Sequence, residues 1–545
     1  MPALSYSHGV SGVPLLGETI GANLERTVAR FGGQEAVVSC HQGVRLTYEE
    51  LDAAVNRLAS GLLAAGVEKG ERVGIWAPNC AEWVLVQFAT AKVGAILVNI
   101  NPAYRTHELE YALRHSGVRM LVSARAFKTS DYVAMVDEVR GRLTELEAVV
   151  FLDGREWDEL AATPIDDAAL RARIAELSFD DPINIQYTSG TTGFPKGATL
   201  SHHNILNNGF FVAELVDYTE QDRVCLPVPF YHCFGMVMGN LGAVTHGSCI
   251  VIPAPGFEPG ATLAAVAEER CTSLYGVPTM FIAQLEHPEF HSYDLTSLRT
   301  GIMAGSPCPV EVMKRVQRDM HMSEVGICYG MTETSPVSTQ TRSDDSLERR
   351  VSTVGRPGPH IEVKIVDPGT GLVVPRGEPG EFCTRGYSVM LGYWDEPEKT
   401  ADAIDEGRWM HTGDLATMDG DGYCNIVGRI KDMVIRGGEN VYPREVEEFL
   451  YAHPDIADVQ VVGVPDARYG EELCAWVVAR GGAELSEEDV RDFCRGRLAH
   501  FKVPRYVVFT DGFPMTVTGK VQKFKMRDDA IAQLGLADAA AVRSA

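Results

Sequence analysis

The feature that most limits the possible folds is a repeated alternation of amphipathic helix and short apolar strand. Residues 46–66 are predicted to form a helix, because apolar side chains recur at helical spacing between Leu51 and Leu62. Thr47 and Glu50 are spaced as a capping box at the start of that helix. A short apolar strand is predicted at residues 71–78, and the helix–strand order recurs at residues 108–123 and 263–274. This order predicts an α/β fold with mostly parallel sheets.

The chain changes character twice in its last third. Residues 361–430 carry short strand-like runs separated by turn sequences such as the Asp-Gly-Asp-Gly of residues 419–422, a pattern typical of hairpins. Beyond Arg429, a helix, a strand and an acid-capped helix are predicted at residues 443–451, 459–464 and 486–498. We therefore place a boundary here, between a large domain over residues 1–429 and a small α+β domain over residues 430–545.

Composition limits the partners and the compartment. The net charge of −25 argues against nucleic acid and anionic membranes as partners. The basic stretch at residues 497–527 is the exception, and a solvated surface explains it as well as a ligand site does. The cysteines are single, with no C-x-x-C pair, and the N-terminal residues lack the pattern of a signal peptide. No apolar run approaches the roughly 20 residues of a membrane span, so we expect a cytoplasmic protein without an integral membrane segment.

A phosphate-binding loop is the strongest local signal. An apolar strand at residues 183–187 runs into a segment of hydroxyl residues, glycines and one lysine, Lys196. Glycines allow backbone N–H groups to surround phosphate oxygens, hydroxyls donate further bonds, and the lysine adds charge. The loop is not a Walker loop, because Gly193 is followed by Phe194 rather than by lysine. Its candidate ligands are Thr188, Ser189, Gly190, Thr191, Thr192, Gly193 and Lys196.

Six further motifs follow this loop in the order seen in the adenylate-forming (AMP-binding) superfamily. They are Tyr329-Gly-Met-Thr-Glu333, Tyr393-Trp394, Thr412-Gly-Asp414, residues 428–432, residues 437–443 and residues 514–520. With the loop, they make nearly the whole chain similar to that superfamily, and specifically to its acyl-CoA synthetase and fatty acid–CoA ligase branch. The resemblance implies a large adenylation domain of several subdomains, with mostly parallel sheets and a distorted β-barrel. A small, mobile α+β lid domain would follow it.

The resemblance also implies roles for individual residues. Tyr329 would stack on adenine, Glu333 would hold Mg²⁺, and Asp414 would bind the ribose hydroxyls. Lys520 would be the catalytic lysine, because an ammonium between the attacking carboxylate and the α-phosphate offsets their repulsion. The remaining ATP contacts would be Gly305, Ser306, Gly330, Thr332 and Arg429; the hinge would be Lys431; and the CoA-side loop would contain Gly437, Gly438 and Glu439.

An acyl pocket is expected beside the motif at residues 230–236. His232 resembles the family's gate near the reacting carboxyl group, although a single histidine is often structural. The other wall residues would be Gly235, Met236, Met303 and Gly330. Met adapts to varied apolar shapes, and a glycine at position 330 is expected to leave the pocket floor open. These features favour a medium-length aliphatic acid over acetate.

The sequence therefore predicts an AMP-forming acid–thiol ligase that uses ATP, Mg²⁺ and CoA. A carboxylic acid and MgATP would give acyl-AMP and pyrophosphate, and CoA would then give acyl-CoA and AMP. Two enzymatic alternatives stay open at this point: a free-standing adenylation enzyme that loads a carrier protein, and a luciferase-like oxygenase. A non-catalytic relative is a third, against which the intact Lys520 and Glu333 argue. The resemblance also disfavours amino-acid activation: the members that activate amino acids use an Asp near the position of residues 230–233 to hold the amine, and no acidic residue lies between Arg223 and Ala254.

Overall fold

The computed structural model describes residues 3–188, 195–305, 308–436, 439–466, 468–481, 483–495, 497–515 and 521–537. The chain divides into two compact units. The larger unit consists of residues Ser7–Val363 and Cys383–His411, and the smaller one of Met1–Tyr6, Lys364–Phe382 and Thr412–Ala545. The predicted boundary at residue 429 is a separate expectation, based on sequence pattern, and it stays a prediction.

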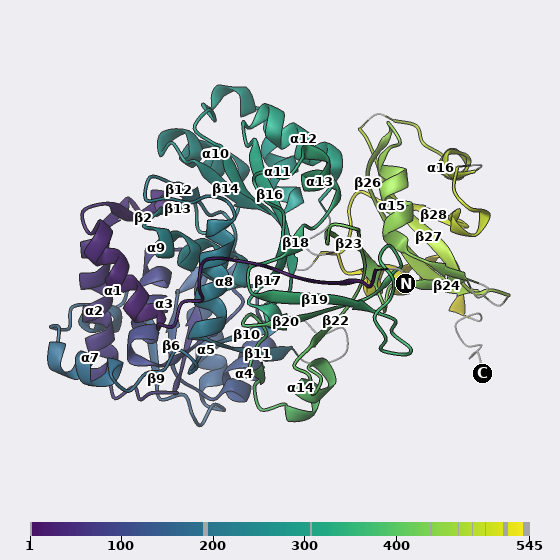
Figure 1. Ribbon diagram of the computed structural model, residues 1–545. Helices are drawn as coiled ribbons and strands as arrows, with labels where there is room; N and C mark the ends of the chain where they lie inside the picture. The colour runs from purple at the N-terminus through teal and green to yellow at the C-terminus, as the bar shows by residue number, and fades with distance from the viewer. Residues whose placement is uncertain are drawn as a thin grey trace. The chain divides into compact units, whose positions relative to one another are not determined.

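Two mostly parallel sheets form the larger unit (Figure 1). The seven-stranded sheet has the order β21 (Gly392–Tyr393), β11 (Lys196–Ser201), β10 (Pro182–Thr188), β5 (Ile96–Asn99), β4 (Arg72–Trp76), β6 (Val118–Ser123) and β9 (Ala148–Phe151). The nine-stranded sheet has the order β18 (Arg356–Pro357), β17 (Val337–Gln340), β16 (Glu324–Gly330), β15 (Thr300–Met303), β14 (Ser273–Gly276), β12 (Arg223–Cys225), β13 (Cys249–Ile252), β2 (Glu35–Ser39) and β3 (Val44–Thr47). Strands β10, β5, β4, β6 and β9 are parallel to one another, as are β16, β15, β14, β12, β13 and β2.

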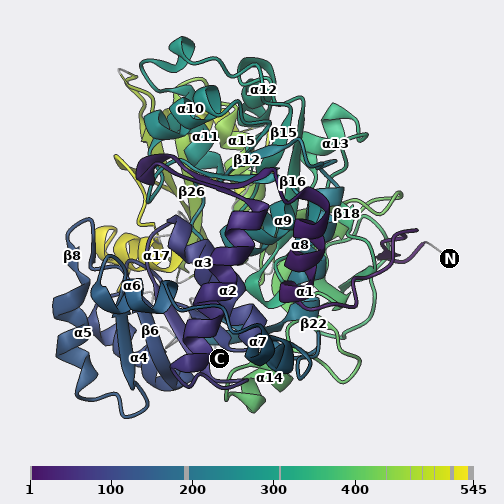
Figure 2. The same cartoon turned by 90° about the vertical axis from the view of Figure 1, so that its left-hand side faces the viewer.

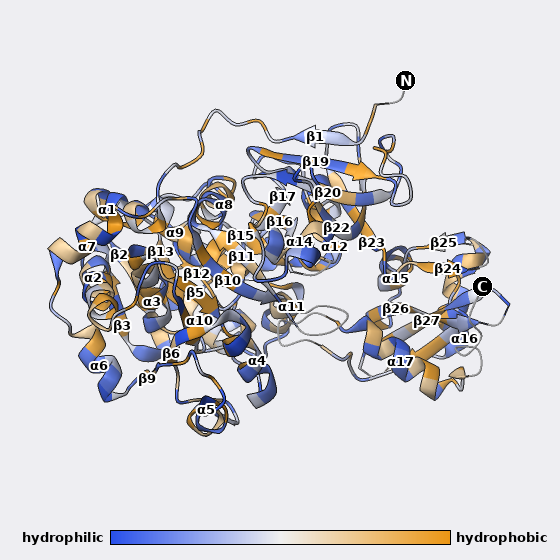
Figure 3. Cartoon of the chain, turned by 90° about the horizontal axis from the view of Figure 1, so that it is seen from below, coloured by the Kyte–Doolittle hydropathy of each residue, from blue (hydrophilic) through white to orange (hydrophobic). Residues whose placement is uncertain are grey.

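Helices cover these sheets and share one core with them. Strands of both sheets contribute to a single cluster of buried side chains, together with α3 (Ala81–Val93), α8 (His202–Glu214) and the π-helix η2 (Phe234–Leu241). Helix α3 is buried almost all round, as expected of a helix without a polar face. Figure 3 shows hydrophobic colour along the strands and hydrophilic colour on outer helices such as α4 and α6. The remaining helices of this unit are α1 (Ile20–Phe31), α2 (Tyr48–Ala64), α4 (Thr106–Ser116), α5 (Tyr132–Arg140), α6 (Arg155–Ala161), α7 (Asp167–Ile174), α9 (Gly242–His246), α10 (Pro259–Glu268), α11 (Pro278–Leu285), α12 (Val310–Asp319), α13 (Leu347–Ser352) and α14 (Pro397–Ala403).

A third sheet replaces the expected barrel. Its strand order is β1 (Tyr6–His8), β19 (Ile361–Val366), β20 (Gly380–Gly386), β22 (Met410–Met418) and β23 (Cys424–Arg429). Its two outer strands, β1 and β23, do not pair with each other in the described residues, so the sheet is open. The expected distorted barrel is therefore not closed. The Asp-Gly-Asp-Gly turn lies between β22 and β23, as predicted, and Asp419 accepts backbone bonds from Asp421 and Tyr423.

The C-terminal part of the smaller unit is an α+β sandwich. Strands β25 (Glu439–Val441), β24 (Val434–Arg436), β27 (Gly470–Ala479) and β26 (Ile456–Asp466) pair in that order, and β28 (Tyr506–Phe509) pairs with β27. One face packs against α15 (Pro443–Tyr451) and α16 (Glu487–Cys494), and the other against α17 (Lys523–Gln533). Neighbouring residues of β26 follow this division, since Val461 belongs to the first core and Val462 to the second.

The predicted helices and strands are confirmed where their signals were local. Helix α2 starts with the capping box of Thr47 and Glu50, and Ser486 caps α16 ahead of three acidic residues. The helix predicted at residues 443–451 matches α15 end for end. Within the described ranges, no helix has both the length and the hydropathy needed to cross a membrane.

Candidate active site

The ends of the phosphate loop are held by a β-hairpin. Strands β10 and β11 are antiparallel, and their last register pair joins Thr188 to Lys196. Residues 189–194, with five of the predicted phosphate ligands, lie outside the described residues. Helix α4 contacts both shoulders of the loop: the Tyr111 hydroxyl donates to Pro195 O at 3.1 Å, and the Tyr187 hydroxyl donates to Ala112 O at 3.1 Å. The loop is thus tethered on both sides by one helix.

Four polar side chains meet beside that loop. Glu333 is buried in the short turn of Thr332–Thr334, and its Oε1 lies 3.3 Å from Thr188 Oγ1. The Tyr393 hydroxyl donates to the same oxygen at 2.8 Å, and Lys196 Nζ donates to that hydroxyl at 3.0 Å. Burial and the nearby Glu333 raise the pKa of Tyr393 well above its ordinary value. The structure therefore brings together three predicted ligands, Thr188, Lys196 and Glu333, and adds a fourth residue, Tyr393, to which the sequence analysis assigned no role.

This cluster fits a magnesium ion by its chemistry. Glu333 Oε1 is engaged by Tyr393 and Thr188, whereas Oε2 receives no hydrogen bond from any residue in the described part of the chain. A carboxylate beside a threonine hydroxyl is an all-oxygen donor set, which Mg²⁺ prefers. Mg²⁺ also keeps several waters and takes phosphate oxygens as ligands, so one protein carboxylate is sufficient.

The predicted adenine contacts follow two neighbouring parallel strands. Strands β15 and β16 pair in parallel, with Met303 opposite Ile327. Gly305 and Tyr329 therefore lie at the carboxyl edge of the sheet, where α/β proteins bind their ligands. Gly305 has a φ of +89°, a conformation that glycine adopts without strain. Tyr329 is half-buried and Thr332 is buried, while Ser306 lies outside the described residues.

The glycines of the predicted acyl pocket mark close backbone approaches. A Cβ atom on Gly330 would lie 1.8 Å from Pro336 O, and one on Gly235 would lie 2.3 Å from Pro229 O. Both positions need glycine because a carbonyl group occupies the place of a side chain. We expected Gly330 to leave open space for the acyl chain. This expectation is wrong for the space that a side chain at position 330 would enter, because the Pro336 carbonyl occupies it.

The remaining pocket candidates are held firmly. Met236 and Met303 are buried, and Met236 Sδ accepts bonds from Asn99 Nδ2 and Gln186 Nε2, each at 3.1 Å. Met236 therefore has a fixed thioether rather than an adaptable one. The half-buried His232 accepts a bond from the Phe234 backbone N–H at its Nδ1, 3.2 Å away, which orients the ring. It precedes a π-helix, a structure frequent at functional sites.

The predicted ribose contacts form an ion pair in the smaller unit. Asp414 and Arg429 are opposite each other on β22 and β23, and Arg429 Nε donates to Asp414 Oδ1 at 2.9 Å. Arg429 is exposed, as are Lys431 and Glu439. Gly437, Gly438 and Lys520 lie outside the described residues.

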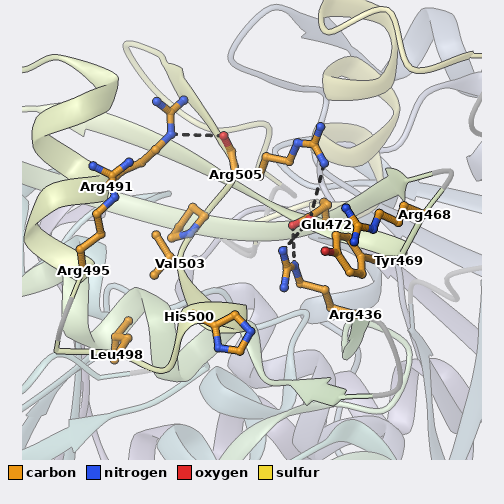
Figure 4. A pocket seen from close by; sticks show the side chains of 11 residues that line it. Arg436, Arg468, Tyr469, Glu472, Arg491, Arg495, Leu498, His500, Val503 and Arg505 are labelled. Atoms are coloured by element: carbon orange, nitrogen blue, oxygen red, sulfur yellow. Dashed lines mark hydrogen bonds and ion pairs between the residues drawn. The ribbon is translucent and has the colours of Figure 1, made fainter.

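The sequence analysis missed most of a basic pocket in the same unit, since only Arg505 of its arginines lies in the basic stretch at residues 497–527 (Figure 4). It has a volume of about 840 Å³, and its charged lining consists of Arg436, Arg468, Arg491, Arg495, Arg505 and Glu472. Glu472 is buried and receives two bonds from Arg436, at 2.7 and 2.8 Å. Arg468 lies over the Tyr469 ring, 5.0 Å from its centroid, and forms no ion pair with a described carboxylate. The five arginines are spread over 70 residues of sequence, so no local sequence pattern predicts that they line one pocket.

Comparisons with known proteins identify the family of the chain. The model of the family "AMP-binding enzyme" matches residues 24–394, and that of the "AMP-binding enzyme C-terminal domain" matches residues 445–520. YngI of Bacillus subtilis, which carries a provisional acyl-CoA synthetase name, is 49% identical over 96% of this chain and 99% of its own. The mitochondrial medium-chain acyl-CoA ligase ACSF2 of Danio rerio is 46% identical over 98% of this chain and 91% of its own.

A solved structure is similar over the same extent of the chain. The anthranilate CoA ligase AuaEII in complex with anthranoyl-AMP has a TM-score of 0.87 and is 28% identical, covering 96% of this chain and 99% of its own.

Proposed function

Because the chain belongs to the AMP-binding enzyme family, as a member of its acyl-CoA synthetase branch, we propose that it activates medium-chain aliphatic acids. The enzyme is an AMP-forming ligase whose substrates are a small carboxylic acid, ATP and CoA, with Mg²⁺. The observation that carries the finer proposal is the 46% identity to a medium-chain acyl-CoA ligase over almost the entire chain. Met236 and Met303, the methionines expected at the acyl pocket, are both buried, and buried apolar side chains there support an aliphatic substrate.

The proposed chemistry uses the residues of the cluster and of the smaller unit. The loop shoulders and Lys196 would hold the phosphates, and Glu333 would hold Mg²⁺, which neutralises phosphate charge when it is bound. Lys520 would offset the repulsion between carboxylate and α-phosphate, and Asp414 with Arg429 would bind the ribose. The adenylate then transfers its acyl group to the CoA thiol. Gly437, Gly438 and Glu439 would accommodate the pantetheine arm, and Lys431 would be the hinge.

The acceptor proposed is CoA rather than a carrier protein. CoA carries phosphate groups on its nucleotide, and the arginine pocket supplies five guanidinium groups against one lining carboxylate. Guanidinium groups bind phosphate in a bidentate manner. We expect Arg468→Ala to raise the KM for CoA about ten-fold while leaving the KM for ATP unchanged, because Arg468 has no carboxylate partner among the described residues to lose. Arg155→Ala, at an exposed arginine of the larger unit, is the control. An unchanged KM for CoA would remove this support for the acceptor.

A substrate panel tests the proposal. Acids from C2 to C18, together with aromatic acids, are supplied with MgATP, with and without CoA. Burying four more methylenes, at about 0.8 kcal/mol each, would favour octanoate over a short acid by about two orders of magnitude in kcat/KM. Equal use of acetate and octanoate would refute the chain-length proposal. Pyrophosphate release without any CoA turnover would favour the carrier-loading alternative.

The compartment is a separate proposal. None of the cysteines forms a disulfide in the described part of the chain, and cysteines kept as thiols suit a reducing compartment such as the cytoplasm. Fractionation of the native host, with detection of the chain in each fraction, tests it. Recovery outside the cytoplasmic fraction would refute it.

A further inference from the structure

Tyr393 occupies a central position between two charged groups of the site. It lies on the edge strand β21, where it pairs with Ala198 of β11, and its side chain is buried. Its hydroxyl is bonded both to Glu333 Oε1, at 2.8 Å, and to Lys196 Nζ, at 3.0 Å. Lys196 Nζ also lies 4.1 Å from the centroid of the Tyr393 ring. One phenol therefore touches both the carboxylate and the ammonium.

The direction of these two hydrogen bonds is fixed by chemistry. An ammonium group can only donate, so the phenol oxygen accepts from Lys196. The single phenol proton is then donated to the Glu333 carboxylate, which can only accept. The chain of bonds runs one way, from Lys196 through Tyr393 to Glu333.

We propose that Tyr393 is a positioning residue that keeps Lys196 and Glu333 from forming a direct ion pair. A direct pair would neutralise both groups, and each is needed with its charge for a different ligand. With the phenol between them, the two groups keep their charges, so that Lys196 can act on phosphate oxygens and Glu333 on Mg²⁺. The inference rests on the roles proposed above for Glu333 and Lys196, and it adds Tyr393 as the residue on which their geometry depends.

The test uses Tyr393→Phe in the full-length chain. This variant keeps the ring and its contact with the ammonium but removes the hydroxyl. ATP binding is measured by calorimetry over a series of Mg²⁺ concentrations and in the presence of a chelator. We expect the affinity for MgATP to fall about 10- to 100-fold, since the lost bonds involve charged groups, while binding of metal-free ATP changes several-fold less. Thioester formation from supplied acyl-AMP should be unchanged.

Two further variants make the result decisive. Tyr48→Phe removes another buried hydroxyl of the same unit, which donates to Ser248 O at 2.7 Å, and should leave the Mg²⁺ dependence as in the wild type. Glu333→Gln should abolish that dependence. If Glu333→Gln binds MgATP normally, the metal role of Glu333 is wrong and the inference falls with it. If Glu333→Gln is defective but Tyr393→Phe matches the wild type, the role of Glu333 stands and the inference about Tyr393 is overturned.

Discussion

At the residue scale, position 330 is restricted to glycine by a steric clash. A Cβ there would lie 1.8 Å from Pro336 O, closer than any van der Waals contact allows, so the backbone must move to admit even alanine. We expect Gly330→Ala to lower the free energy of unfolding by about 1–3 kcal/mol, the usual cost of overpacking, measured by urea denaturation. Gly330→Trp should lose stability rather than shift the chain-length profile towards acetate.

The matched control is Gly141→Ala. Gly141 follows α5 with a φ of −64°, and a Cβ added there meets nothing within 4 Å. This substitution should be neutral or stabilise by up to about 1 kcal/mol, because alanine restricts the unfolded chain. A Gly330→Ala variant as stable as Gly141→Ala would mean that the Pro336 carbonyl yields without cost.

His202 gives the larger unit a pH dependence. The Ile20 N–H donates to its Nδ1 at 3.2 Å, and its buried Nε2 has no hydrogen-bond partner among the residues that the structure describes, so the ring is held neutral. Burial lowers the pKa of His202 to about 3, below an unfolded value near 6.5. The stability it contributes is therefore complete above about pH 6.5 and is lost as pH falls towards 3, by about 1.4 kcal/mol per unit. Urea denaturation between pH 7 and pH 5 should show this slope, and His202→Asn should flatten it. An equal slope in both proteins would assign the effect to other groups.

Motifs predicted which residues of the site would meet, but not what holds them together. The sequence predicts Thr188, Lys196 and Glu333 as ligands because each lies in a motif whose residue types indicate phosphate or metal binding. Tyr393 was not given a role, because its bonds span 60 and 197 residues of sequence and depend on how an edge strand pairs. The close approach of the Pro336 carbonyl to Gly330 was not predicted either. A glycine in the sequence does not tell whether the space beside its Cα is open or is filled by another part of the chain.

At the element scale, three helices are joined by one buried charge. Lys92 of α3 is fully buried, and its ammonium donates to Asp52 Oδ1 and Asn56 Oδ1 of α2, each at 2.7 Å, and to Glu25 Oε1 of α1 at 3.1 Å. Figure 2 shows α1, α2 and α3 side by side. The two carboxylates differ in exposure, with 21% for Asp52 and 49% for Glu25. The lysine therefore depends mainly on Asp52.

That difference predicts unequal costs. Asp52→Ala should lower the free energy of unfolding by about 3 kcal/mol, since it leaves a buried ammonium without its main partner. Glu25→Ala should cost under about 1 kcal/mol, as for an exposed pair. Lys92→Met combined with Asp52→Ala should recover much of the loss, because it removes the stranded charge. Urea denaturation of the three variants and the wild type checks this, and equal costs for Asp52→Ala and Glu25→Ala would contradict it.

The helices that the sequence predicts correctly are those whose capping residues and apolar spacing lie close together in the sequence. The capping boxes and apolar periodicity of α2 and α16 are local, and both helices formed where they were expected. The open sheet from β1 to β23 was not predicted as such, because it joins the N-terminal residues to strands more than 350 residues later. Strand pairing at that distance leaves no periodicity in the sequence.

At the scale of the whole molecule, one active site must perform two half-reactions in turn. Lys431 stands two residues after Arg429, in the turn between β23 and β24, and resembles the family's hinge. A residue that changes its backbone dihedrals between two states cannot do so as proline, whose φ is fixed near −65°. The preceding residue is also restricted, which stiffens the turn further.

We therefore expect Lys431→Pro to separate the two half-reactions. The rate of acyl-AMP formation, measured as pyrophosphate release, should stay within a few-fold of the wild type. Thioester formation from supplied acyl-AMP should fall about 100-fold, the cost of a misplaced reacting group.

Lys520→Ala should show the opposite pattern, with adenylation reduced roughly 10²–10³-fold, because it removes a charge needed only in the first step. Lys431→Ala is the matched control, since it removes the side chain but leaves the dihedrals free. If Lys431→Ala blocked the thioester step as fully as Lys431→Pro, the side chain rather than the backbone would be responsible. If Lys431→Pro stopped both half-reactions, the pivot would lie elsewhere in the chain.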